Sequence, residues 1–259
     1  EWGSAAYHQQ REKPVREQIQ INREAIRKRY RAEKFLIYFQ AYTNTFGRFR
    51  ELEYFYKEAL KEKDVVGIVV GTRPDCLPKR VLQKFSEIAR ENYLSVELGV
   101  QTFDDAQLRF LSRGHDSASS LKAIRKLKTL PDINLCVHLM FGLPDETDAQ
   151  IRKTAEILSE QKVDGVKLHN LHVLRNTPLE KLYRESHFKP VDLEEYSRKV
   201  ALFLENLSPK IAVHRLAAVA SRWDELVAPQ WTREKMKTTQ FIDDFLAAKE
   251  TWQGRCFEV

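Results

Sequence analysis

The sequence predicts an α/β protein built around a parallel sheet, and three observations support this prediction. First, short apolar runs typical of buried strands recur five times, at intervals of roughly thirty residues. Second, each run is followed by a polar loop and then by apolar residues at helical spacing, as in a chain of βαβ units. Third, no Gly-rich dinucleotide fingerprint follows any run, which favours a full or partial (β/α) barrel over a doubly wound sheet. The predicted strands lie at residues 35–40, 65–70, 96–101, 134–140 and 165–169.

Helix signals separate these strands. Pro78 opens the helix expected at residues 78–90, because proline is favoured in the first helical turn. Asp104 starts the next helix as an N-cap, and that helix stops at Arg113-Gly114-His115. Other helices are expected at residues 9–31, 48–63, 117–130, up to 160 and from 179. Past Asp192 the pattern changes to a helix at 193–207, a short strand at 211–215 and a helix at 231–249, without a linker that would mark a separate domain.

Length and composition narrow the class of protein. The 259 residues suffice for one large α/β domain or two small ones, and the formal net charge is +6. No apolar run is long enough to span a bilayer, and no signal-peptide segment is present, so we expect no membrane partner. The three cysteines are far apart and odd in number, which argues against a disulfide framework and favours a cytoplasmic location.

The first expected helix carries a dense basic face. Its basic residues are Arg11, Lys13, Arg16, Arg23, Arg27, Lys28, Arg29 and Arg31. Such a run is most often a solvated helix face, and the alternative is a surface that contacts the phosphates of a nucleic acid. Both interpretations stay open at this point.

Polar side chains gather where the third expected strand ends. The apolar run Val96–Val100 leads into Gln101 and Thr102, and the helix that follows returns Arg113 and His115 beside them. Ligands of α/β proteins bind at the carboxyl ends of parallel strands. A strand-to-helix turn with incidental polar residues is the alternative, but similar polar loops follow the other strands.

Four of these strand ends resemble those of the radical S-adenosylmethionine (SAM) enzymes. Along the chain the motifs are GTRPDCLP, LGVQT…LSRGHD, HLMFGLPDET and DGVKLHNLHVLRNTPLEKLY. The branch they resemble most is the YhcC-like one, near the catalytic subunit of elongator and the oxygen-independent coproporphyrinogen oxidase. The resemblance implies a partial (β/α)6-type TIM barrel at residues 1–191 and a C-terminal extension at 192–259 that packs on it.

The resemblance also implies two cofactors. In this family SAM lies across the top of the partial barrel, and a 4Fe–4S cluster held by three cysteines reduces it to give a 5′-deoxyadenosyl radical. An electron donor such as flavodoxin or ferredoxin is then required. Two members of the family's pattern are missing here. Gly71 replaces an acidic residue that relatives often have, and no CxxxCxxC-type loop is present.

The three cysteines of the chain cannot replace that loop, because Cys76, Cys136 and Cys256 belong to three separate elements. We therefore expect no metal ligands in this chain. The favoured explanation is that the first strand and the cluster loop lie upstream of Glu1, which should then sit beside the rim of the barrel. The alternative is a degenerate homologue that has lost the cluster and only binds SAM.

By resemblance, the cofactor-binding residues come from five strand ends. Ala41, Tyr42 and Thr43 take the place of the loop that meets the SAM amino group, and Thr72 follows the second strand. Gln101 matches a polar residue near the ribose, and Arg113 one that pairs with the SAM carboxylate. The backbone of Met140, Phe141, Gly142 and Leu143 matches the border of adenine, and Lys167 and His169 face the same cavity.

The remaining histidines have plainer interpretations. His138, inside an apolar strand, is expected in the core, and His115 to fix its turn. His169 and His172 fit a pocket and a packing role equally well. The substrate is expected near the C-terminal group His214, Arg215, Trp223 and Trp231.

Three functions follow from these expectations. The first is a radical SAM enzyme that modifies tRNA at the wobble uridine, with the basic N-terminal helix as an electrostatic contact for the RNA. The second is a radical SAM enzyme with a small-molecule substrate. The third is a SAM-binding module without a cluster.

Overall fold

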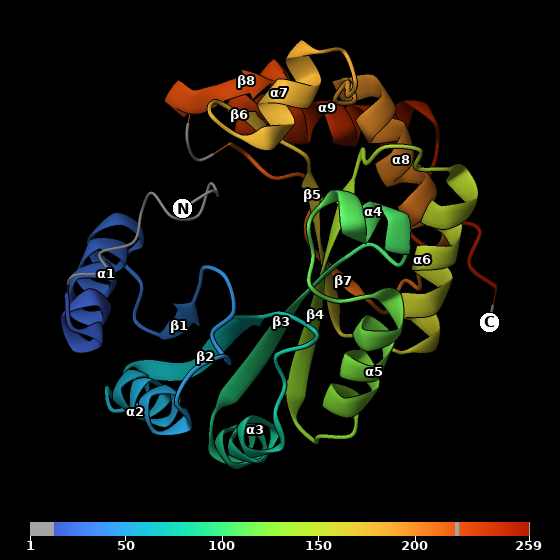
Figure 1. Ribbon diagram of the computed structural model, residues 1–259. Coiled ribbons are helices and arrows are strands. Elements are labelled where there is room, and N and C mark those ends of the chain that lie inside the picture. Colours follow the sequence, from blue (N-terminus) through green and yellow to red (C-terminus); the bar gives the residue numbers. More distant parts are fainter. Residues whose placement is uncertain (1–12, 221–222, 259) are drawn as a thin grey trace.

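The computed structural model describes residues 13–220 and 223–258. Its main sheet has six parallel strands in the order β1-β2-β3-β4-β5-β7, and it curls into a partial barrel with α2, α3, α5 and α6 on its outer side (Figure 1). A second sheet pairs β6 with β8 in antiparallel fashion. The strands are β1 Phe35–Phe39, β2 Val65–Thr72, β3 Tyr93–Gln101, β4 Ile133–Phe141, β5 Gly165–Asn170, β6 Val173–Leu174, β7 Ala212–Arg215 and β8 Leu226–Ala228. The helices are α1 Val15–Tyr30, α2 Phe49–Ala59, α3 Lys79–Glu91, α4 Asp105–Phe110, α5 Ser117–Lys128, α6 Asp148–Glu160, α7 Pro178–Arg184, α8 Leu193–Asn206 and α9 Lys235–Ala248, with 3-10 turns at Trp223–Glu225 and Gln230–Arg233.

The predicted partial barrel is confirmed. Every sequential pair from β1 to β5 is parallel, and β7 extends the sheet beside β5. The C-terminal helix expected at 231–249 is divided, because a 3-10 turn precedes α9. The two-stranded sheet of β6 and β8 was not expected. The expected helix start at residue 9 and the expected place of Glu1 lie outside the described residues.

Helix caps begin the helices that lead away from the strand ends. Asp104 Oδ1 accepts a hydrogen bond from the Gln107 backbone N–H at 2.8 Å, at the start of α4. Thr147 and Gln150 form a capping box at the start of α6. Each cap satisfies backbone donors that a helix leaves unpaired, so each fixes where its loop ends.

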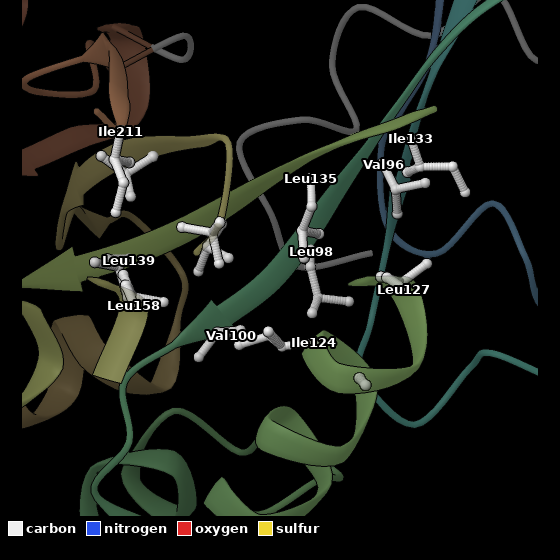
Figure 2. Close-up of a cluster of buried hydrophobic side chains, with 14 of the residues drawn as sticks. Val96, Leu98, Val100, Ile124, Leu127, Ile133, Leu135, Leu139, Leu158 and Ile211 are labelled. Atoms are coloured by element: carbon white, nitrogen blue, oxygen red, sulfur yellow. The ribbon is translucent and has the colours of Figure 1, made fainter. Parts of the chain in front are cut away.

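The hydrophobic core lies between the sheet and the outer helices. Alternate residues of a strand point to opposite faces, and those on the outer face of the central strands are apolar. Figure 2 shows Val96, Leu98 and Val100 of β3 packed beside Ile124 and Leu127 of α5. All five are at most 1% exposed. Burying this face orients β3 and leaves its other face to the inside of the partial barrel.

The C-terminal elements contact the same core. The rings of Phe203 on α8 and Phe141 on β4 meet edge to face, with centroids 5.2 Å apart. A smaller apolar cluster of Val173, Phe188 and Ala228 joins the second sheet to the segment after α7. Among the described residues, no helix is long and apolar enough to cross a membrane.

The inner face of the sheet is polar, and a carboxylate lies at its centre. Glu97 of β3 has a side chain only 5% exposed, and it accepts hydrogen bonds from three other strands. The Nε2 atom of His138 on β4 lies 2.7 Å from Glu97 Oε2. The Tyr38 hydroxyl of β1 donates to the same oxygen, and the Lys167 ammonium of β5 donates to Oε1. One carboxylate therefore links four strands across the inner face.

These contacts change how Glu97 and His138 ionise. Burial alone would raise the pKa of Glu97, but the hydrogen bonds from His138, Lys167 and Tyr38 together outweigh it and lower that pKa to about 2. Burial lowers the pKa of His138 in spite of its bond to Glu97. The imidazole is therefore neutral at pH 7 and donates its Nε2–H to the carboxylate, as a satisfied core histidine does.

We expect Glu97→Gln to remove part of the acid sensitivity of folding. The folded-state pKa of about 2 lies below the ordinary glutamate pKa of 4.5, so the stabilisation is present above pH 4.5 and is lost as the pH falls toward 2. Protonation of Glu97 should therefore lower the free energy of unfolding of the wild type by on the order of 3 kcal/mol between pH 6 and pH 2. Denaturant titration across this pH range measures the change. Glu97→Gln should also be less stable at pH 7, because it leaves the Lys167 ammonium without its carboxylate.

Glu156→Gln is the matched control, since Glu156 pairs with Lys153 on the exposed side of α6. Its pH profile should parallel that of the wild type. If the Glu97→Gln profile is also parallel to the wild type, the Glu97 carboxylate does not carry this stabilisation.

Candidate functional site

The loop after β1 is fixed against the end of β2. The Asn44 side-chain amide donates to the backbone carbonyls of Ala41 and Gly71, both at 3.1 Å, and its backbone N–H donates to the Gly71 carbonyl at 3.0 Å. The hydroxyls of Thr43 and Thr72 lie 2.9 Å apart. The structure thus brings together the residues that the sequence placed at the first two strand ends. Tyr42 in this loop is 54% exposed.

Gln101 and Arg113 meet over Gly99, at the end of β3. The Arg113 Nη2 atom donates to the Gly99 carbonyl at 3.0 Å. A Cβ atom on Gly99 would lie 3.1 Å from Gln101 Nε2 and 3.2 Å from Arg113 Nη2, which is closer than side chains normally approach. The absence of a side chain at Gly99 therefore leaves room for the side chains of Gln101 and Arg113. Gln101 has a left-handed backbone with φ of 70°, a conformation that non-glycine residues adopt mostly where surrounding contacts impose it.

Arg113 is a half-buried cation with no counter-ion among the described residues. Burial lowers its pKa, and its buried Nε has no hydrogen-bond partner among the described residues. The neighbouring carboxylate of Asp75 is engaged by Arg73, with Nε to Oδ1 at 2.9 Å and Nη2 to Oδ2 at 2.6 Å. An unpaired guanidinium in such a place suits a bound carboxylate, which its planar fork can hold through two hydrogen bonds.

The end of β4 is held by a buried ion pair. The Gly142 backbone N–H donates to Glu146 Oε2 at 2.9 Å, and Lys199 of α8 lies 3.3 Å from the same oxygen. Burial raises the pKa of Glu146 despite these contacts. The Gly142 N–H is therefore already used within the protein, and it is not available to a base edge as the sequence suggested.

The four residues of this strand end also point to different sides. Phe141 packs outward against Phe203, and Leu143 is buried. Met140 shares the inner face with His138, because strand residues two apart point the same way. Of the four, Met140 is the side chain that faces the polar interior.

Lys167 and His169 lie on the inner face of β5, as expected, but each is engaged by another side chain. Lys167 pairs with Glu97, and the ring of His169 lies 5.3 Å from that of His138. The Arg215 guanidinium donates to His169 Nε2. Burial and the Arg215 charge hold the pKa of His169 well below its ordinary value, so its Nε2 is a neutral acceptor.

His172 has a structural role, one of the two that the sequence left open. Its Nε2 lies 2.8 Å from the amide nitrogen of Asn170, and the Asn170 oxygen accepts from the Ala218 backbone N–H at 2.9 Å. Burial lowers the pKa of His172 to about 4. The histidine thus anchors the end of β5 to the segment after β7.

Sequence reasoning missed Glu97 and placed Arg215 only in a broad substrate group. Glu97 interrupts the apolar run Val96-Leu98, and a charge in the middle of a buried strand is rare unless it is paired. That interruption was the available signal. Arg215 carried no comparable signal, because it lies in a short strand with mixed neighbours.

The cysteines lie on three separate elements, as the sequence indicated. Cys76 follows β2, Cys136 is fully buried in β4 and Cys256 is exposed near the C-terminus. Burial raises the pKa of Cys136 to about 12, which disfavours the thiolate that a metal needs. Within residues 13–220 and 223–258, no group of three or more His, Cys, Asp or Glu side chains could hold a metal ion. The described residues therefore do not fit an iron–sulfur cluster, whereas the unpaired Arg113 does fit the carboxylate of SAM.

Comparison with known proteins identifies the family. The model of the Radical SAM superfamily matches residues 4–158, and that of the Radical_SAM C-terminal domain matches residues 163–248. Protein YhcC of Escherichia coli K12 is 35% identical over 217 residues, which are 83% of this chain and 70% of YhcC. A tRNA uridine(34) acetyltransferase of Methanocaldococcus jannaschii is 28% identical over 152 residues, which are 58% of this chain and 27% of that protein.

A solved structure shares the fold. The archaeal Methanocaldococcus infernus Elp3 with an N-terminal deletion superposes with a TM-score of 0.77 at 19% identity. The match covers 92% of this chain, which spans only 60% of that Elp3 chain. Because the superfamily model covers more than half of the residues and YhcC is similar over most of them, the chain belongs to the radical SAM superfamily, whose enzymes use S-adenosylmethionine and a 4Fe–4S cluster.

Proposed function

We propose that the protein is a radical SAM enzyme that modifies RNA, with the wobble uridine of tRNA as its target. The observation that carries the RNA part is a set of exposed, unpaired cations on α1. The name of one relative, a tRNA uridine(34) acetyltransferase, supports the same substrate class. The reaction requires an electron donor such as flavodoxin or ferredoxin. A cytoplasmic location fits the three free cysteines.

The basic face of α1 divides into two parts. In one part, Arg23 and Arg27 pair with Asp64, which attaches the helix to the start of β2, and Lys13 pairs with Glu17. Their charges are therefore compensated. The other part is exposed and has no ion-pair partner among the described residues. It comprises Arg16, Lys28, Arg29 and Arg31, and Arg11 lies outside the described residues. Cations of this kind bind phosphates at little cost, because they release counter-ions and lose no internal partner.

The SAM site in this proposal is formed by the ends of β1 to β4. Ala41, Tyr42, Thr43 and Thr72 would form one side of it. Gln101 and Arg113 would form the centre, and Met140 at the end of β4 would form the other side. Arg113 would hold the SAM carboxylate, and its packing over Gly99 would orient it. If SAM bound here beside a cluster held by other residues, the two would supply radical chemistry to the substrate. The described residues of this site would bind and orient SAM.

We expect Arg113→Gln to weaken SAM binding by roughly 1.5–3 kcal/mol, the value of a hydrogen bond to a charged group. Isothermal titration calorimetry on the anaerobically prepared full-length protein measures this directly. Arg73→Gln is the matched control, because Arg73 lies nearby but is paired with Asp75. A folded Arg113→Gln protein with wild-type affinity for SAM would refute the role of this arginine.

We expect tRNA binding to weaken with salt and to depend on α1. The triple variant Lys28→Gln, Arg29→Gln, Arg31→Gln should bind tRNA less tightly, and the slope of log K against log salt should fall by up to about 3. Fluorescence anisotropy with labelled tRNA at several salt concentrations gives both quantities.

The control carries the same loss of charge on α5, as Lys122→Gln, Arg125→Gln and Lys126→Gln. These three residues line one surface hollow of α5, away from α1. If both triple variants lose affinity equally, the binding is non-specific. If tRNA does not bind at physiological salt, a small-molecule substrate replaces RNA as the function.

A further inference from the structure

We propose that Arg215 and His169 form a binding site for an anionic group of the substrate, a phosphate or a carboxylate, at the β5–β7 edge of the inner face. The proposal rests on the proposed function in one respect, that SAM occupies the ends of β1 to β4. The substrate is then left with the opposite edge of the same face. No part of the proposal depends on how tRNA meets α1.

The guanidinium of Arg215 has unused donors. Its Nε donates to the Leu168 carbonyl at 3.3 Å, and its Nη2 donates to His169 Nε2. A guanidinium has five N–H groups, so these two contacts leave the Nη1 hydrogens and one Nη2 hydrogen without a described acceptor. Because Arg215 is half-buried, water does not fully surround the group, but a ligand can still reach it.

Arg215 is also unusual in its lack of a carboxylate partner. Five described arginines are half-buried: Arg23, Arg73, Arg113, Arg198 and Arg215. Three of them are neutralised by carboxylates, Arg23 by Glu62 and Asp64, Arg73 by Asp75, and Arg198 by Asp148 and Glu195. Arg113 and Arg215 have no carboxylate within ion-pair distance among the described residues. Since Arg113 suits the carboxylate of SAM, Arg215 is left for a second anion.

The groups around Arg215 also leave its positive charge uncompensated. Glu97 is a carboxylate of the inner face that acts on Arg215 electrostatically, and its charge is already compensated by Lys167. His138 and His169 are neutral at pH 7, because burial lowers the pKa of each. The edge therefore carries one uncompensated positive charge in a partly dehydrated place. Such a charge is costly to bury alone, and a bound anion removes the cost.

The guanidinium group of Arg215 is already oriented by the protein before any ligand binds. His169 Nε2 and the Leu168 carbonyl each accept from it, and both belong to β5. The next residue, Leu216, accepts a hydrogen bond through its carbonyl from the buried Tyr196 hydroxyl at 2.8 Å. A guanidinium that is already oriented loses little entropy when it binds an anion through two hydrogen bonds. In this proposal His169 is a positioning residue for Arg215, not a ligand of SAM.

The test uses uridine 5′-monophosphate, uridine, inorganic phosphate and succinate as probes in isothermal titration calorimetry. The full-length protein should bind uridine 5′-monophosphate at least about tenfold more tightly than uridine, as one charged hydrogen-bond pair implies. Inorganic phosphate and succinate distinguish a phosphate site from a carboxylate site. The anion that binds more tightly identifies the group of the substrate. Arg215→Gln should lose the preference for uridine 5′-monophosphate and should bind SAM with unchanged affinity.

Arg113→Gln is the matched variant, because Arg113 is the other half-buried arginine without a carboxylate. It should lose SAM affinity and keep the preference for uridine 5′-monophosphate. A failure of SAM binding therefore speaks against the proposed function, and a failure of anion binding speaks against this site. The site is refuted if none of the anions binds better than uridine, or if Arg215→Gln binds them as the wild type does.

A second measurement needs no variant, in case Arg215→Gln does not fold. Phenylglyoxal modifies accessible guanidinium groups, and mass spectrometry of the wild-type digest reports the modification rate at Arg215. The preferred anion should slow that rate at least about tenfold at saturation, whereas uridine should not. An equal rate with and without the anion would contradict the proposal.

Discussion

The inner face of this protein depends on one buried carboxylate. Glu97 could not remain charged in a partly dehydrated place unless its oxygens were hydrogen-bonded. Tyr38, His138 and Lys167 meet this requirement from three other strands. In a closed barrel, layers of apolar side chains fill the interior. Here a paired charge links the strands, so the inside of the curved sheet stays polar while the outside packs against helices.

The ion pair of Glu97 and Lys167 lies between two arginines, Arg113 and Arg215, that have no carboxylate partner among the described residues. Lys167 lies between Arg113 and Arg215 in the order of the strands, and Glu97 neutralises it. On the described part of the inner face, positive charge without a counter-ion is therefore left at two places, Arg113 after β3 and Arg215 at the end of β7. A sulfonium cofactor with a carboxylate and an anionic substrate are the kind of ligands that such an arrangement can hold on one face. The neutral imidazoles of His138 and His169 lie between the two places and add no charge.

The sequence predicted the sheet well, because the signal for a buried parallel strand is local. An apolar run bounded by polar loops indicates such a strand, and Gln101 and Arg113 could be placed together because they flank one short helix. The contacts of Glu97 are not local. Its partners are 41, 59 and 70 residues away, so no spacing rule connects them. The sequence analysis did not predict the strands β6 and β8 for a different reason: strands of two or three residues are too short to show an alternating apolar pattern.

The backbone at the end of β4 marks another limit of sequence reasoning. A motif can show which residues lie beside a ligand, but it does not show which N–H groups the protein already uses. The Gly142 N–H is used by Glu146, whose charge is balanced by Lys199 from a helix more than fifty residues later. Contacts of this kind depend on how the C-terminal helices pack, and the local pattern carries no record of them.

The most direct test of two separate ligand sites is whether both ligands bind at once. Calorimetric titration of SAM into the full-length protein, with and without saturating uridine 5′-monophosphate, measures this. Two separate sites predict one equivalent of SAM and an affinity within about twofold in both titrations, because the ligands share no residue. Competition, seen as a SAM affinity that falls in proportion to the nucleotide concentration, would show instead that Arg113 and Arg215 serve one site.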